Sequence, residues 1–146
     1  MHKVDLLRRD MRANAFVMQL FDMPSHVAAA AILFGGDRWS CVEVVAMLSV
    51  NGKDAGIATL SPTREDGKDE PTVVALWIDP ELRSHPEYIS YGVEMLKTLA
   101  GESVRLYGRI ATFATVTLEE QNIAEEAIKQ SVDFIHVRVT QHGVDW

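Results

Sequence analysis

The fold of this 146-residue chain is decided by the stretch TVVALWIDP at residues 72–80. A nearly continuous apolar run of this length predicts a central strand that is buried on both faces of a sheet. Asp79 and Pro80 end the run, because proline offers no N–H to a sheet and aspartate hydrogen-bonds readily within a turn. We therefore predict a sheet with helices packed against it.

The residues before this strand predict a hairpin. Residues 41–50 and 55–60 are rich in Val, Ile and Thr, and they flank Asn51-Gly52. Asn-Gly tolerates positive φ at both central positions of a tight turn, so it is a strong hairpin signal. Residues 61–71 are polar and contain proline, glycine and acidic residues, which predicts a loop between the hairpin and the central strand.

The first part of the chain predicts two helices. Apolar residues recur every three or four positions from Val4 to Phe21, as on one face of an amphipathic helix. The pair Met23-Pro24 breaks this helix, since proline disfavours helix in the residue before it. A second short helix is expected over residues 25–34, ended by two glycines.

After the central strand, helices and strands alternate. A helix with Ile89 and Leu96 on its apolar face is expected to stop at Gly101. A strand follows over residues 109–116, and the pattern Thr117-x-x-Glu120 predicts a capping box that starts the next helix. A last strand covers residues 132–139. The predicted order is α-α-β-β-β-α-β-α-β. It forms one α/β domain over residues 1–146, with a leading helical pair in 1–36 and the sheet with its helices in 41–140.

Composition excludes several classes of function. The chain has 14 Lys and Arg against 21 Asp and Glu, a net charge of −7, which argues against nucleic-acid binding. Its single cysteine, Cys41, excludes an internal disulfide and is expected to be a small buried residue. The histidines lack the spacing of a metal site, so we expect no metal. No apolar run is long enough to cross a membrane, and we expect a cytoplasmic protein.

Three segments in this order resemble the GCN5-related N-acetyltransferase (GNAT) superfamily. The hairpin at residues 50–58 looks like the second and third strands of that family. Residues 75–83 are similar to its fourth strand with the exit hydrophobic-Asp-Pro, and residues 122–134 have the length and apolar spacing of its last helical block. The resemblance covers residues 41–139 and implies a GNAT-like mixed central sheet flanked by helices.

The resemblance also implies acetyl-CoA as cofactor. In this family the fourth and fifth strands splay apart, the pantetheine arm pairs with the exposed edge of the fourth, and the pyrophosphate lies on backbone amides before the next helix. The acyl group then passes directly to an amine, and a tyrosine commonly protonates the leaving thiolate. Carried onto this sequence, the cofactor-binding residues are Ile78, Ser90, Tyr91, Gly92, Val93 and Asn122.

The chain departs from the family where phosphate and proton are handled. Glu87 stands where the family has a cationic or neutral residue, Ser90 replaces a glycine, and Lys129 occupies the position of the usual tyrosine. In an alternative interpretation, the helix starts near Pro86 and contains Gly92, without a phosphate loop. Asn122 and Lys129 also have an alternative interpretation, as ordinary residues on the surface of a helix.

Two functions stay open at this point. The first is a GNAT-like, acyl-CoA-dependent N-acetyltransferase that acts on a small-molecule or protein amine, with or without impaired chemistry. The second is a catalytically inactive GNAT-like protein that binds a protein partner, for example a phage structural or inhibitory component. The sequence assigns no catalytic acid or base.

Overall fold

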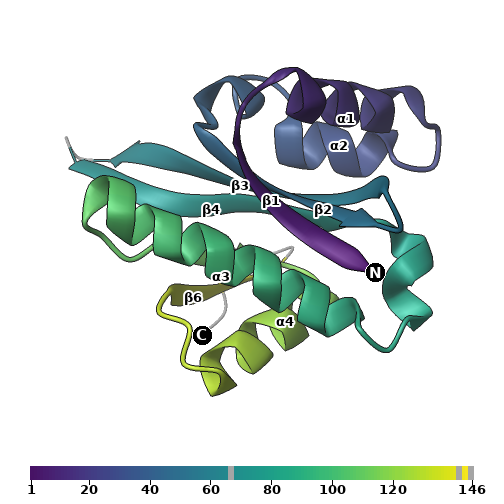
Figure 1. Cartoon of the computed structure of the whole chain (residues 1–146). Helices are drawn as coiled ribbons and strands as arrows, with labels where there is room; N and C mark the ends of the chain where they lie inside the picture. Colours follow the sequence, from purple (N-terminus) through teal and green to yellow (C-terminus); the bar gives the residue numbers. More distant parts are fainter. Residues whose placement is uncertain (66–67, 141–142, 145–146) are drawn as a thin grey trace.

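The protein is a mixed sheet with two helices packed on each face (Figure 1). The computed structural model describes residues 1–65, 68–140 and 143–144. Its strands are β1 (His2–Arg8), β2 (Val44–Val50), β3 (Lys53–Glu65), β4 (Lys68–Ile78), β5 (Thr112–Thr115), β6 (Ile135–Thr140) and β7 (Gly143–Val144). Its helices are α1 (Met11–Asp22), α2 (Val27–Phe34), α3 (Tyr88–Tyr107) and α4 (Leu118–Lys129), with short 3₁₀ turns η1 (Trp39–Cys41) and η2 (Pro80–Ser84).

The strands lie side by side in chain order, from β1 to β7. Strands β1 to β4 are antiparallel, β4, β5 and β6 are parallel, and β7 is antiparallel to β6. Helices α1 and α2 cover one face, and α3 and α4 cover the other (Figure 1). The prediction of an α/β fold with a mixed central sheet flanked by helices is confirmed.

Each face of the sheet has its own hydrophobic core. Along β2, Val44, Ala46 and Leu48 pack toward α3 and α4, whereas Val45 and Met47 pack toward α1 and α2. This alternation follows from the two-residue period of a strand. Because both faces are covered, β2 reads as a continuous apolar run instead of an alternating one.

The first predicted helix is wrong in its first half. Residues 2–8 form strand β1, which pairs with β2 from His2 with Val50 to Arg8 with Val44. The helix starts only at Met11, where the Asp10 side chain accepts a hydrogen bond from the N–H of Ala13 at 3.0 Å. The leading segment 1–36 is therefore a strand followed by two helices. The few apolar residues in 2–8 fit both the period of a helix and the two-residue period of a strand, and the long-range pairing with β2 decides for the strand.

The turn at Asn51-Gly52 is confirmed. Asn51 has φ of 53° and Gly52 has φ of 82°, and Val50 pairs with Lys53 across the turn. Both central residues thus have the positive φ of the tight hairpin that the dipeptide predicts. The chain start also contributes, because the N-terminal ammonium donates to Asn51 Oδ1 at 2.9 Å.

The predicted loop over residues 61–71 is wrong wherever the structure describes it. Strand β3 continues to Glu65 and β4 begins at Lys68, so that Ser61 pairs with Thr72 and Glu65 pairs with Lys68. Residues 66–67 lie outside the described residues. Polar composition does not exclude a strand here, because the hydrogen bonds of a hairpin come from the backbone.

Helix α3 is longer than predicted. It passes through Gly101 and ends at Tyr107, where Gly108 closes it in the left-handed conformation with φ of 65°. The Gly108 N–H donates to the carbonyl oxygen of Val104 at 2.9 Å. A glycine within a helix weakens it without ending it, and the left-handed cap is the position that requires a glycine.

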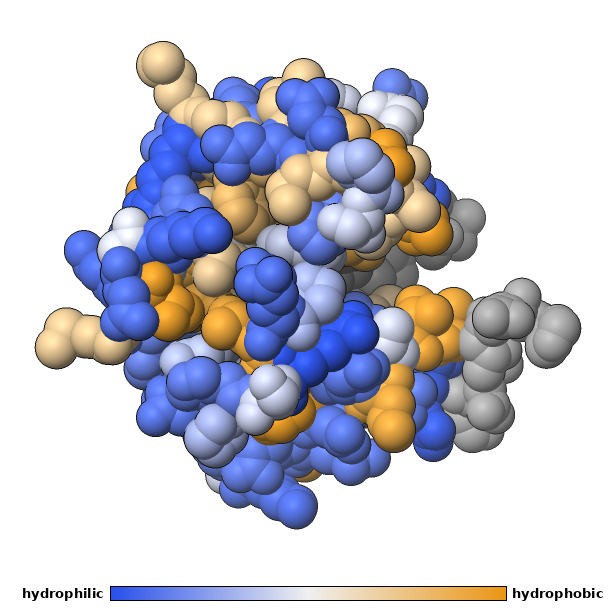
Figure 2. Space-filling view, turned by 90° about the vertical axis from the view of Figure 1, so that its right-hand side faces the viewer, coloured by the Kyte–Doolittle hydropathy of each residue, from blue (hydrophilic) through white to orange (hydrophobic). Residues whose placement is uncertain are grey.

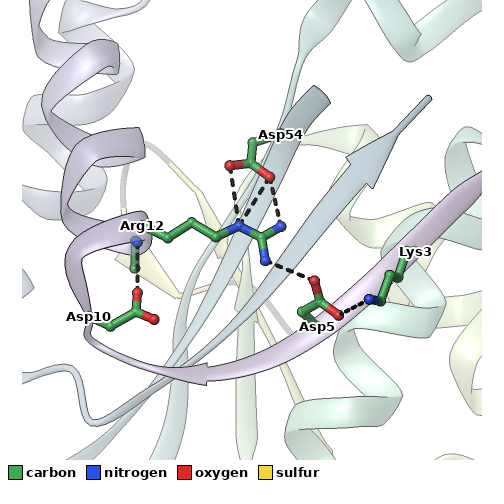
Figure 3. Close-up of polar contacts among 6 residues, drawn as sticks. Lys3, Asp5, Asp10, Arg12 and Asp54 are labelled. Atoms are coloured by element: carbon green, nitrogen blue, oxygen red, sulfur yellow. Dashed lines mark hydrogen bonds and ion pairs between the residues drawn. The ribbon is translucent and has the colours of Figure 1, made fainter. Parts of the chain in front are cut away.

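One arginine of helix α1 links two strands of the sheet, β1 and β3 (Figure 3). The Arg12 guanidinium on α1 donates to Asp5 Oδ2 on β1 at 2.8 Å and to Asp54 Oδ1 on β3 at 2.7 Å. Lys3 adds an ion pair to Asp5 at 3.3 Å. The hydrogen bond from Arg12 holds the pKa of Asp5 below its usual value.

We expect Arg12→Met to lower the free energy of unfolding at pH 7 by about 1–2 kcal/mol, because charge-assisted hydrogen bonds are lost. The lowered pKa of Asp5 means that its contribution is present above the ordinary value of 3.8 and fades as the pH falls through the folded pKa. Urea titrations at pH 7 and pH 3 should therefore show a smaller difference at pH 3. Lys97→Met, at an exposed position of α3, is the control.

Two further properties are the apolar content of the helices and the hydropathy of the surface. Among the described residues, no helix combines the length and the apolar composition needed to cross a membrane. The face that carries the N-terminus is largely hydrophilic, with hydrophobic residues in small separate groups (Figure 2).

Candidate functional site

Strands β4 and β5 separate after a short stretch of pairing. Among the described residues they pair only through Thr72 with Thr112 and Val73 with Phe113. Strand β5 continues along β6 as far as the pair Thr115 with Arg138. Residues 75–78 of β4 and residues 114–116 at the end of β5 therefore bound an opening in the sheet, which we name the β4–β5 gap.

A bulge in β4 begins the separation. Thr59 of β3 pairs with Ala75, whereas the next residue, Leu60, pairs with Val73, so β4 carries one extra residue at this point. A bulge of this kind bends the strand and increases its twist. The consequence is that β4 stays on β3 while it turns away from β5.

The edge of β4 in the gap offers backbone hydrogen-bonding groups. The Asp79 N–H donates to the carbonyl oxygen of Ala55 on β3 at 2.8 Å. Because successive residues of a strand point their N–H and C=O groups to opposite sides, those of Leu76 and Ile78 point into the gap. Backbone groups at such a strand edge are able to pair with an extended ligand that carries amide groups.

The gap opens into a cavity of about 1440 Å³. Its walls in the gap are Leu76, Trp77 and Ile78 of β4 together with Ala114 and Val116. This volume exceeds the roughly 300–1,000 Å³ typical of a pocket for one drug-sized ligand. The cavity therefore has room for a long cofactor and a second substrate.

One end of the cavity lies between η2 and the starts of α3 and α4. It is lined by Pro80, Arg83, Tyr88, Thr117, Glu119 and Glu120, and we call it the η2–α4 end. Tyr88 is buried, and this burial raises the pKa of its hydroxyl although the neighbouring Arg83 opposes the shift. Arg83 lies 3.8 Å from a Glu119 oxygen, a loose ion pair that leaves most of its donors available.

The acidic residues at this end are partly committed to structure. The Glu120 carboxylate accepts from the N–H of Thr117 at 3.0 Å, and the Thr117 hydroxyl accepts from the N–H of Glu120 at 3.1 Å. The predicted capping box is confirmed. In the same way, Asp79 Oδ1 accepts from the N–H of Glu81 at 3.0 Å, so this aspartate stabilises the turn as expected.

The phosphate loop predicted over residues 87–92 is replaced by helix. Helix α3 begins at Tyr88, so the alternative interpretation, a helix from about Pro86 that contains Gly92, is the one the structure supports. The Tyr91 N–H already donates to the carbonyl oxygen of Glu87 at 2.9 Å. The N–H groups of Ile89 and Ser90 make no backbone hydrogen bond with the described residues and are the available donors of this helix start.

Gly92 has a packing role in this helix. A β-carbon there would lie 2.8 Å from Cγ1 and 2.9 Å from Cγ2 of Ile123 on α4, and closer still to Cδ1. The missing side chain therefore allows α3 and α4 to approach closely. Its neighbours Tyr91 and Val93 are buried as well, and Tyr91 packs on His2 and His85 with ring centroids 4.8 and 5.7 Å apart.

The structure brings together only part of the predicted cofactor set. Ile78 lines the cavity, whereas Ser90, Tyr91, Gly92 and Val93 do not. Ser90 is exposed at the start of α3. Asn122 and Lys129 are exposed on α4 and do not line it either. A cofactor contact through any of the six predicted residues stays a prediction. In the structure Tyr91, Gly92 and Val93 are buried in helix α3, and Asn122 lies on the surface of α4.

Sequence reasoning missed Arg83, Tyr88 and His26 as cavity residues. They come from segments far apart in the chain, and no spacing rule connects them. Cys41 was expected to be buried, but it is exposed and lines the cavity, because η1 replaces the start of the predicted strand. Within the described residues, no group of three His, Cys, Asp or Glu is placed to hold a metal ion.

Comparison with known proteins gives the same fold. No protein-family model and no curated protein matches the sequence. Among solved structures, an aminoglycoside acetyltransferase from an uncultured soil metagenomic sample, in complex with sisomicin, is similar with a TM-score of 0.54 and 13% identity, over 88% of this chain and 86% of that one. Its trehalose complex gives 0.52 and 12%, over 90% and 86%.

A ribosomal-protein-alanine N-acetyltransferase from Brucella melitensis biovar Abortus 2308 is similar with a TM-score of 0.51 and 14% identity, over 86% of this chain and 90% of that one. At such identities the likeness concerns the fold alone. This chain has the fold of the GNAT acetyltransferases.

Proposed function

We propose that this protein binds an acyl-CoA in the β4–β5 gap and transfers the acyl group to a primary amine. The observation that carries the proposal is the free edge of β4 at Leu76 and Ile78, which opens into a cavity of about 1440 Å³. The two similar proteins are named as acetyltransferases of an aminoglycoside and of a ribosomal protein, and both of these acceptors carry amines. Fold alone does not establish activity, so the proposal rests on the site.

The gap suits the pantetheine arm of such a cofactor. Pantetheine contains two amide groups on an extended chain, and an extended ligand pairs with a sheet edge as an added strand does. The backbone groups of Leu76 and Ile78 would bind these amides. Trp77 and Val116 would then exclude water from the thioester, which supplies the activated acyl group.

The phosphates would lie at the η2–α4 end of the cavity. There Arg83 supplies a cationic group. The N–H groups of Ile89 and Ser90, which follow the cavity-lining Tyr88, would supply donors at a helix start, where the helix dipole favours an anion. Glu87 and Glu119 weaken the site, because like charges repel. In this arrangement Arg83 takes the place of the family's glycine-rich loop.

A second candidate is the inactive binding protein. Two features favour this candidate. A helix from Tyr88 onward replaces the loop whose backbone N–H groups would bind phosphate, and Glu87 before it is acidic. On this interpretation the cavity binds a segment of a protein partner.

Calorimetry separates the two candidates. We expect acetyl-CoA and desulfo-CoA to bind with micromolar dissociation constants, and acetyl-pantetheine to bind more weakly because it lacks the nucleotide. Heat effects indistinguishable from dilution with up to millimolar acetyl-CoA would overturn the acyltransferase and favour the binding protein. Transfer is then measured as free thiol released in the presence of a panel of primary amines.

The charged residues near the η2–α4 end give a prediction in which two substitutions change the affinity for acetyl-CoA in opposite directions. Glu87→Gln should lower the dissociation constant of acetyl-CoA by roughly threefold, because it removes a repulsive carboxylate at a solvent-screened site. Arg83→Gln should raise the same constant by roughly tenfold, because it removes a charge-assisted contact. Neither change should alter the binding of acetyl-pantetheine. Equal effects on both ligands would place the phosphates elsewhere.

A further inference from the structure

The cavity continues past the β4–β5 gap onto the face of the sheet covered by α1 and α2. This part is lined by Ser25 and His26 before α2, by Ala29 and Ile32 on α2, and by Asp37, Arg38 and Cys41 after it. We name it the α2 arm. Its lining residues lie on and around α2, whereas those of the η2–α4 end belong to η2 and to the starts of α3 and α4, so a ligand in the α2 arm would meet the gap from the other direction.

His26 is fixed at the junction between the α2 arm and the gap. Its N–H donates to the carbonyl oxygen of Met23 at 2.9 Å, and its own carbonyl oxygen accepts from the N–H of Ala30 at 2.9 Å. Its ring packs edge-on against Trp77, with centroids 5.2 Å apart and planes at 70°. Trp77 is itself held by the ring of Phe16 at 5.7 Å, so the imidazole has a defined position beside the β4 edge.

The other titratable groups along the cavity are less suited to accept a proton. Arg38 has no acceptor atom, and its guanidinium donates to the carbonyl oxygen of Ile32 at 2.7 Å. Across the gap, Glu120 is held in its capping box and Glu119 faces Arg83. Asp37 is exposed at the far rim, and Cys41 is exposed on η1. In the part of the chain that the structure describes, the ring nitrogens of His26 make no hydrogen bond.

We propose that His26 accepts a proton from the acceptor ammonium, in an acceptor site formed by the α2 arm. This inference rests on the proposed function. The ammonium gives one proton to the imidazole, and the lone pair so freed forms the N–C bond with the thioester carbonyl. The C–S bond breaks, its electron pair leaves on sulfur, and the thiolate receives the second proton of the nitrogen. The imidazolium then loses its proton to water.

The walls of the α2 arm also define the body of the acceptor. From Val27 to Phe34, helix α2 contains no charged or polar residue, and Ile32 is 69% exposed where it lines the cavity. An apolar wall next to a proton acceptor fits a primary amine on an apolar group. A polycation would place some of its further ammonium groups against this apolar wall, where Asp37 is, among the described residues, the one carboxylate that lines the α2 arm and Arg38 lies next to it.

The test compares four variants in a transfer assay with acetyl-CoA and 2-phenylethylamine, with spermine as the polycationic probe. His26→Gln should lower kcat/KM for 2-phenylethylamine about 100-fold, the range of general-base catalysis, and should remove the acidic limb of the pH profile. The dissociation constant of acetyl-CoA should stay within about twofold. Imidazole added to His26→Ala should restore part of the rate, as expected when a proton acceptor has been removed.

Two matched variants serve as controls. His2→Gln removes a histidine that pairs with Glu94 at 2.6 Å, outside the cavity, and should change kcat/KM by less than about twofold. Asp37→Asn tests the competing carboxylate of the α2 arm and should leave the acidic limb of the pH profile in place.

The outcomes separate the inference from the proposed function. Three results would overturn the inference. They are a kcat/KM of His26→Gln within about threefold of the parent, a large loss of kcat/KM in Asp37→Asn instead, and a higher kcat/KM for spermine than for 2-phenylethylamine. Absence of transfer to every amine by a protein that binds acetyl-CoA would overturn it also and leave cofactor binding intact. Absence of acetyl-CoA binding would overturn the proposed function itself.

Discussion

Gly92→Ala should lower the free energy of unfolding by about 1–3 kcal/mol, the usual cost of inserting a methyl group into a packed interface. The new methyl group would lie within 3 Å of three atoms of Ile123, a buried residue of α4. Because Ile123 is β-branched and fully enclosed, it has no alternative rotamer into which it can move easily. Urea unfolding followed by circular dichroism measures the effect.

Gly101→Ala is the matched control on the same helix. No atom lies within 4 Å of a β-carbon at Gly101, which is exposed, so alanine there should stabilise the helix by roughly 0.5–1 kcal/mol. The double variant Gly92→Ala/Ile123→Val should lose less than the sum of its single changes, because valine removes the clashing Cδ1. Additive losses, or a neutral Gly92→Ala, would contradict the packing role of Gly92.

Ala114→Trp should weaken acetyl-CoA binding at least about 100-fold, equal to about 2.7 kcal/mol. Ala114 is half-buried on β5 and lines the cavity in the gap. An indole placed there occupies the space into which the β4 edge opens, so an extended ligand no longer reaches the backbone groups of Leu76 and Ile78. Calorimetry with acetyl-CoA and with desulfo-CoA should show the same loss.

Ala28→Trp serves as the control for Ala114→Trp. Ala28 is exposed on α2 and does not line the cavity, so tryptophan there adds the same group outside the site. Both variants should melt within a few degrees of the parent, which shows that the fold survives. If Ala114→Trp binds acetyl-CoA as tightly as the parent, the cofactor does not occupy the β4–β5 gap.

The pattern of right and wrong sequence predictions has a physical cause. The turn at Asn51-Gly52, the capping box of Thr117 and the turn at Asp79 were predicted correctly. Each of them depends on the conformational preferences or hydrogen bonds of residues that are close together in the chain. Local chemistry of this kind is legible without knowledge of the fold.

The errors concern features set by distant partners. Residues 2–8 became a strand because β2 pairs with them over their whole length, and the hairpin of β3 and β4 extends through polar residues for the same reason. The sequence left Gly92 between a phosphate loop and a helix interior, because it does not show Ile123 packed against this glycine. Pairing and packing across the sheet override local preference at such positions.

The sequence by itself determined that this chain is an α/β domain with a buried central strand. It also showed a family resemblance, which three short segments carry. Only the tertiary structure decided where a ligand would bind. The cavity joins Arg83 and Tyr88 to the β4–β5 gap and, on its other side, His26. These residues lie on separate elements whose relative positions depend on the bulge in β4 and the packing of helices on both faces, neither of which leaves a local signal.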